Sequence, residues 1–152
     1  MWYDEMLTQL CPAALTAFFA VLVFVAGQVV IKFFVEPIHR QSEVIGEIAH
    51  SLNYHANVFG KLAHSINPRI GERADEAVTT YRDLASKLRA STATIKWYGF
   101  WAFLKLVPKH TEIEAASSRL IYLSNVVFGD DRSWEAIHEA QEAIRKALHL
   151  RF

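Results

Sequence analysis

Residues 13–35 read AALTAFFAVLVFVAGQVVIKFFV, and only Thr16, Gln28 and Lys32 interrupt this apolar stretch with polar side chains. About 20 apolar residues, each rising about 1.5 Å along a helix, span the hydrocarbon core of a bilayer. The stretch therefore predicts one transmembrane helix. Residues 1–12 are then a short extracytoplasmic N-terminus.

The charges around this stretch set its expected orientation. Lys32 lies near its C-terminal end and Arg40 and Lys61 follow it, whereas no Lys or Arg precedes it. Because positively charged flanks favour the cytoplasmic side, we expect the C-terminal part in the cytoplasm. The membrane is expected to be a cell membrane, specifically a bacterial inner membrane. A cleaved signal peptide is the alternative, but Asp4 and Glu5 stand where such a peptide carries basic residues.

Composition limits what the remainder, residues 38–152, is expected to be. The chain has 152 residues, enough for one ordinary domain beside the anchor. Its 16 Lys and Arg are balanced by 16 Asp and Glu, so the basic excess that drives nucleic-acid binding is missing and no nucleic-acid partner is expected. Cys11 has no second cysteine to pair with, which favours a reducing compartment.

Beyond the anchor, apolar residues recur at alternating three- and four-residue steps once two polar positions, Gln41 and His55, are included. This is a heptad seam typical of a coiled coil. It predicts a helix that ends at about Ile66. The apolar seam positions are Ile38, Ile45, Ile48, Leu52, Phe59, Leu62 and Ile66.

Counting the same alternation backwards places a stripe of small residues on one side of the membrane helix. Small residues let membrane helices approach one another closely. We therefore expect the chain to form a homo-oligomer through its membrane helix and first cytoplasmic helix. The expected interface residues are Ala13, Ala17, Ala20, Gly27, Ile45, Ile48, Leu52, His55, Phe59 and Leu62.

Three further segments carry helical periodicity. The first runs from about Glu72 to Ile95, and the last from about Ser133 to Leu150. Between them a helix is expected to begin at a capping box of Thr111 and Glu114. The fold class is therefore all-α: a transmembrane helix that continues into a cytoplasmic up-down bundle of about four helices.

Residues 97–108, WYGFWAFLKLVP, are the least ordinary stretch outside the anchor. They are too short to span a bilayer, and the second cytoplasmic helix is expected to bring them back to the lipid surface. We therefore interpret the segment as a membrane-interface contact. Burial in the bundle core is the alternative. The residues concerned are Trp97, Tyr98, Phe100, Trp101, Phe103 and Lys105.

The histidines raise a metal-site hypothesis, which their spacing disfavours. His39, His50 and His64 lie several turns apart, too far for an i, i+4 ligand pair. A composite site with His110 or His138 stays open, but no metal or cofactor is expected. His55 is the polar exception within the seam, where it would act as a hydrogen-bonding or pH-sensitive position.

Three functions follow as hypotheses. The first is a non-enzymatic scaffold, sensor or regulator, whose partners are the lipid bilayer, a second copy of the chain and another membrane protein. The second is an oligomeric pore or transport accessory, with Gln28 and Lys32 as polar groups in the membrane. The third is a small histidine-dependent metal enzyme.

Overall fold

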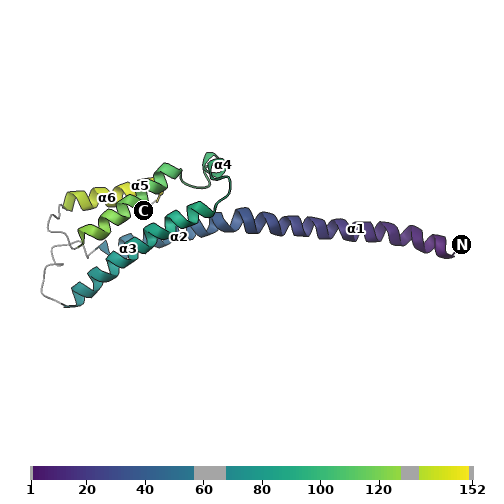
Figure 1. Ribbon diagram of the computed structural model, residues 1–152, viewed down its shortest axis with the longest axis horizontal. Helices are drawn as coiled ribbons and strands as arrows, with labels where there is room; N and C mark the ends of the chain where they lie inside the picture. Colours follow the sequence, from purple (N-terminus) through teal and green to yellow (C-terminus); the bar gives the residue numbers. More distant parts are fainter. Residues whose placement is uncertain (1, 57–67, 128–133, 151–152) are drawn as a thin grey trace. The chain divides into compact units, whose positions relative to one another are not determined.

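The computed structural model describes residues 2–56, 68–127 and 134–150, with side chains from residue 14 and, after the first gap, from residue 72 (Figure 1). Within these ranges every regular element is helical, which confirms the all-α class. Contacts divide the chain into two units, Met1–Glu36 and Pro37–Phe152. The elements are α1 (Trp2–Val30), η1 (Ile31–Val35), α2 (Glu36–Tyr54), α3 (Pro68–Thr94), α4 (Tyr98–Phe103), α5 (His110–Val126) and α6 (Trp134–Ala147).

Helix α1 is long and apolar enough to cross a membrane, and it is the one helix in the described part of the chain with that property. Its side chains from Ala14 to Val30 are all exposed. Valine, leucine and phenylalanine on every side of a helix are unfavourable in water, because their apolar area stays hydrated. Among the described residues, none covers this surface.

Element η1 is a π-helical turn, in which the backbone N–H of Glu36 donates to the carbonyl of Ile31. It stands directly before Pro37, whose ring nitrogen has no hydrogen to donate. A π turn holds more residues than an α turn, so it rotates the helix face that follows. The seven-residue repeat therefore does not continue unchanged through residues 31–35.

Helices α2, α3, α5 and α6 run alternately up and down, as the sequence predicts. Gln41 near the start of α2 lies beside Thr92 near the end of α3, so these two helices are antiparallel. Helices α3 and α5, and α5 and α6, are antiparallel in the same way. The contacts that show this order are Gln41 to Thr92 at 2.8 Å, Arg82 to Asn125 at 3.1 Å and His149 to Glu112 at 3.5 Å.

This order gives the bundle two different ends. One end, which we call the Gln41 end, gathers the start of α2, the end of α3, α4 and the start of α5, together with the last turn of the chain. The opposite end, the Trp134 end, holds the start of α3 and of α6. Figure 1 shows α4 beside the end of α3.

The core of the bundle is formed by one side of each long helix. In α2, Ile48 and Leu52 have no exposed surface and His55 is 3% exposed, while Ile45 packs partly buried against the same core. The expectation that Ile48, Leu52 and His55 form an interface between copies is therefore wrong, because the same chain covers them. Phe59 and Leu62 lie outside the described residues.

Helix boundaries differ from the predicted ones where local chemistry decides them. Helix α2 ends at Tyr54, before the predicted end at Ile66. Helix α3 begins at Pro68, earlier than predicted, because proline suits the first helical position, where no N–H bond is needed. Helix α5 begins at His110, so the predicted cap at Thr111 lies inside its first turn.

Candidate membrane-contact site

The segment 97–108 leaves the bundle after α3, forms the short helix α4 and returns to α5. Two left-handed residues shape this excursion: Trp97 before α4, with φ of 55°, and Lys105 after it, with φ of 58°. Such conformations cost a non-glycine residue of the order of 1 kcal/mol and persist where surrounding contacts hold them. One such contact runs from the Trp101 indole N–H to the Lys96 carbonyl at 3.0 Å.

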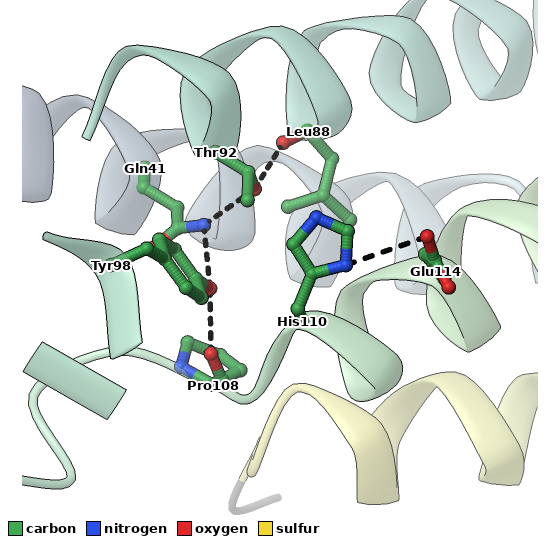
Figure 2. A network of polar contacts seen from close by, with 7 residues as sticks. All are labelled: Gln41, Leu88, Thr92, Tyr98, Pro108, His110 and Glu114. Atoms are coloured by element: carbon green, nitrogen blue, oxygen red, sulfur yellow. Dashed lines mark hydrogen bonds and ion pairs between the residues drawn. The ribbon is translucent and has the colours of Figure 1, made fainter. Parts of the chain in front are cut away.

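A buried hydrogen-bond network attaches the segment to α2 (Figure 2). The Gln41 side-chain amide donates to the hydroxyl oxygen of Thr92 at 2.8 Å and to that of Tyr98 at 3.3 Å. Thr92 in turn donates to the Leu88 carbonyl at 2.8 Å, and Tyr98 donates to the Pro108 carbonyl at 2.6 Å. Gln41 thus joins α2, α3 and both ends of the segment.

The direction of each bond in this network is determined. Both hydroxyl hydrogens are used on backbone carbonyls, so both hydroxyl oxygens accept, and the group of Gln41 that faces them must be its NH₂. Burial raises the pKa of Tyr98, which keeps its hydroxyl protonated and able to donate. Within the described residues the buried Oε1 of Gln41 has no hydrogen-bond partner.

The apolar side chains of the segment divide into two groups. Val107 and Pro108 are buried, and Tyr98 packs partly buried against the core. A second group points away from the bundle. For the residues of this group, the alternative of burial in the bundle core is wrong. Its members, which we call the exposed aromatic group, are Trp97 (73% exposed), Phe100 (54%), Phe103 (81%), Leu104 (46%) and Leu106 (57%).

The predicted interface residues are therefore not equivalent. Trp97, Phe100 and Phe103 stand out in solvent, and Lys105 is exposed beside them. Tyr98 instead turns its hydroxyl towards Gln41 and Pro108. Trp101 is half-buried, with its ring edge-on to Phe100 at 5.2 Å between ring centres.

Charged groups surround the exposed aromatic group. Lys96, Lys105 and Lys109 are all exposed on or beside the segment. At the N-terminus of α5, the Lys109 backbone N–H donates to Glu112 Oε2 at 2.7 Å. Glu114, predicted as the capping partner, instead pairs with the imidazole of His110 at 3.4 Å (Figure 2).

The residues predicted on the membrane helix lie on open surface wherever the structure describes their side chains. Ala17, Ala20, Gln28 and Lys32 are exposed, and a Cβ added at Gly27 would meet nothing within 4 Å. The side chain of Ala13 lies outside the described residues. No contact among the described residues thus requires these positions to be small.

The histidines are dispersed. The described residues contain no group of three His, Cys, Asp or Glu side chains that could hold a metal ion. His39 pairs with Glu43 at 3.3 Å on the surface of α2. His55 is enclosed by two tyrosine rings, with ring centres 4.8 Å away in Tyr54 and 5.8 Å away in Tyr81.

The interpretation of the sequence missed the role of Gln41. A glutamine inside an apolar seam signals a buried polar contact, but its partners, Thr92 and Tyr98, are distant in the sequence and were not identifiable from spacing. Leu104 and Leu106 were also missed as exposed members of the segment. No family model, curated protein or solved structure matches this chain.

Proposed function

We propose that this chain is a non-enzymatic single-pass membrane protein whose cytoplasmic bundle is attached to the bilayer at a second point, the exposed aromatic group. Held there with its Gln41 end against the lipid, the bundle serves as a scaffold that presents its Trp134 end to a partner. The observation that carries this proposal is the exposure of Trp97, Phe100 and Phe103 on a segment bonded to the start of α2.

Chain length supports the proposed placement without any assumption about the angle between the two units. Gln41 follows Val35, the last residue of the apolar stretch, by six positions. Even a fully extended chain covers only about 20 Å in that interval. The network of Gln41 therefore keeps the segment within reach of the head groups once α1 spans the membrane.

Energetics also favour a lipid contact for this group. Removing one large apolar side chain from water is worth roughly 1.5–3 kcal/mol, and each lysine near an anionic leaflet adds about 1 kcal/mol. Because α1 already holds the bundle at the membrane, docking loses little further translational freedom. Three aromatics and their flanking lysines then suffice to keep the segment docked.

Self-association is the second part of the proposal, now limited to the membrane helix. The exposed small side chains at Ala17 and Ala20, and the open space around Gly27, support close approach of a second helix. Gly27→Leu should reduce crosslinked oligomers in membranes without changing insertion, with Val29→Leu, on the opposite side of the helix, as the matched control. Unchanged crosslinking in Gly27→Leu would remove this face from the proposal.

The docking proposal is tested with the full chain in proteoliposomes that contain brominated lipid. Two variants each retain one tryptophan, Trp97 or Trp134, with the other three replaced by phenylalanine. Trp134 is the matched control because it is also exposed, at 62%, but lies at the opposite end of the bundle. Bromine quenches indole fluorescence only at close range, so it reports which of the two rings enters the lipid.

The proposal predicts strong quenching and a blue shift for Trp97, with neither for Trp134. Adding Phe100→Ser and Phe103→Ser to the Trp97 variant should remove most of the quenching, because two of the apolar contacts are lost. Equal quenching of the two tryptophans, or none of either, would contradict docking of the Gln41 end.

A further inference from the structure

A groove lies next to the exposed aromatic group, between the end of the segment 97–108, the start of α5 and the last turn of the chain. Its volume is about 1030 Å³, at the upper end of the range for small-molecule sites. One part of its wall is apolar and is formed by Leu106, Val107 and Leu148. Another part carries the lysines Lys105, Lys109 and Lys146.

The charge of this groove is positive. Its lining carries four Lys and Arg side chains against two carboxylates, and both carboxylates have partners in the same wall: Glu112 with the Lys109 backbone and with His149 at 3.5 Å, and Glu142 with Arg145 at 2.9 Å. Among the described residues, the ammonium groups of the three lysines form no ion pair. They come from three different positions, on the segment, before α5 and at the end of α6, and all three side chains line the groove.

We propose that the groove binds the phosphate group of an anionic phospholipid drawn from the adjacent bilayer. The ammonium groups of Lys105, Lys109 and Lys146 surround the phosphate, while the glycerol and upper acyl carbons lie along Leu106, Val107 and Leu148. This inference rests on the proposed docking of the exposed aromatic group, because docking is what brings the groove to the lipid.

Two features favour a phospholipid over a free phosphate ion. The charged and apolar walls stand side by side in one groove, which matches a molecule with an anionic head and an apolar body. In addition, Glu112 places a negative charge in the first turn of α5, where it accepts from the Lys109 N–H, and this charge disfavours a free phosphate at the backbone N–H groups there. The lysine side chains are therefore the main recognition groups.

The test uses native mass spectrometry of the full chain in detergent, with phosphatidylglycerol and phosphatidylcholine added at equal concentration. We expect phosphatidylglycerol adducts to dominate in the parent protein. Lys109→Gln with Lys146→Gln should lower their abundance on the order of tenfold, because two attractive charges are lost. Lys87→Gln, which removes the same kind of charge from α3, is the control and should leave them unchanged.

Three outcomes would overturn the inference: equal binding of the two lipids, an equal loss in Lys87→Gln, or displacement of the lipid by millimolar inorganic phosphate. The single-tryptophan quenching experiment separates this inference from the proposed function. Retained Trp97 quenching in phosphatidylcholine vesicles, together with a failure of lipid selectivity, leaves docking intact and rejects only the groove. Circular dichroism of each lysine variant confirms that the bundle is folded.

Discussion

The seam of α2 and the segment 97–108 are both apolar, but their side chains face in opposite directions. The seam of α2 is turned inwards, so that Ile48 and Leu52 have no exposed surface. The segment 97–108 turns its largest side chains outwards, and Phe103 is 81% exposed. Regular three- and four-residue spacing places the apolar side chains of a helix on one face, which can be buried against neighbouring helices. A short aromatic run between two left-handed residues cannot place all its rings on one side.

The largest expected effect is on the free energy of unfolding, which a substitution in the seam should lower far more than one in the segment 97–108. Ile48→Ala removes a fully buried side chain and should lower the free energy of unfolding by about 2–5 kcal/mol. Phe103→Ala, on exposed surface, should change it by less than about 0.5 kcal/mol. Chemical denaturation of the detergent-solubilised chain, followed by circular dichroism, gives both values. An unchanged stability in Ile48→Ala would mean that the seam is not part of the core.

The next effect concerns the bond that joins the two regions. Tyr98→Phe deletes the hydroxyl that accepts from Gln41 and donates to the Pro108 carbonyl. Leaving these buried groups unsatisfied should cost about 1–3 kcal/mol. Amide hydrogen exchange should rise mainly in residues 97–108. A rise spread evenly over all helices would show that the network does not hold the segment specifically.

A smaller effect is expected at the start of α5. Glu112→Gln keeps an acceptor for the Lys109 N–H but removes the negative charge near the helix N-terminus and the pairing with His149. The expected loss is about 0.3–1 kcal/mol at low salt, and it should shrink when salt screens the charge. Glu114→Gln, whose partner is the exposed His110, serves as the comparison and should cost less.

The smallest effect is a pH dependence of stability that arises from the buried His55 at the Trp134 end. Burial lowers the pKa of His55 below its ordinary value of 6.5; Glu76 opposes this shift, whereas His50 and Arg73 add to it. The unfolded chain therefore takes up this proton at a higher pH than the folded chain. The contribution to stability is present above pH 6.5 and is lost as pH falls towards the folded pKa.

A comparison of two proteins isolates this contribution. Unfolding is measured from pH 8 to pH 5 for the parent and for His55→Gln, and the difference between the curves reports His55 alone. The parent should lose more stability below pH 6.5 than His55→Gln does. Parallel curves would show that burial does not shift the pKa of His55.

Much of the architecture could be predicted from the sequence because each long helix carries its own periodicity. Spacing within one segment is enough to predict the apolar stretch 13–35 and the helices near 72–95 and 133–150. Short connections between the helices then predict their up-down order. Periodicity does not say what covers a face, however. The seam of α2 would read the same whether a second copy or α3 packed against it, and α3 is what the structure shows.

The candidate site was predictable in composition but not in orientation. The aromatics and lysines of residues 97–108 suggested a lipid contact from their types alone. Which rings face outwards depends on the left-handed turns at Trp97 and Lys105 and on the distant bond from Gln41. The π turn before Pro37 was equally hidden, because the way a helix accommodates a missing N–H depends on its three-dimensional surroundings.

The membrane depth of two positions shows directly whether the Gln41 end of the bundle docks on lipid while the Trp134 end does not. In the full chain with Cys11→Ser, a spin label is placed at Phe103→Cys or at Trp134→Cys, and electron paramagnetic resonance compares its accessibility to oxygen and to a water-soluble nickel complex. If the Gln41 end docks on lipid, the label at position 103 lies below the phosphates, exposed to oxygen, while that at position 134 lies in water. Equal exposure of both labels to the nickel complex would contradict docking of the Gln41 end.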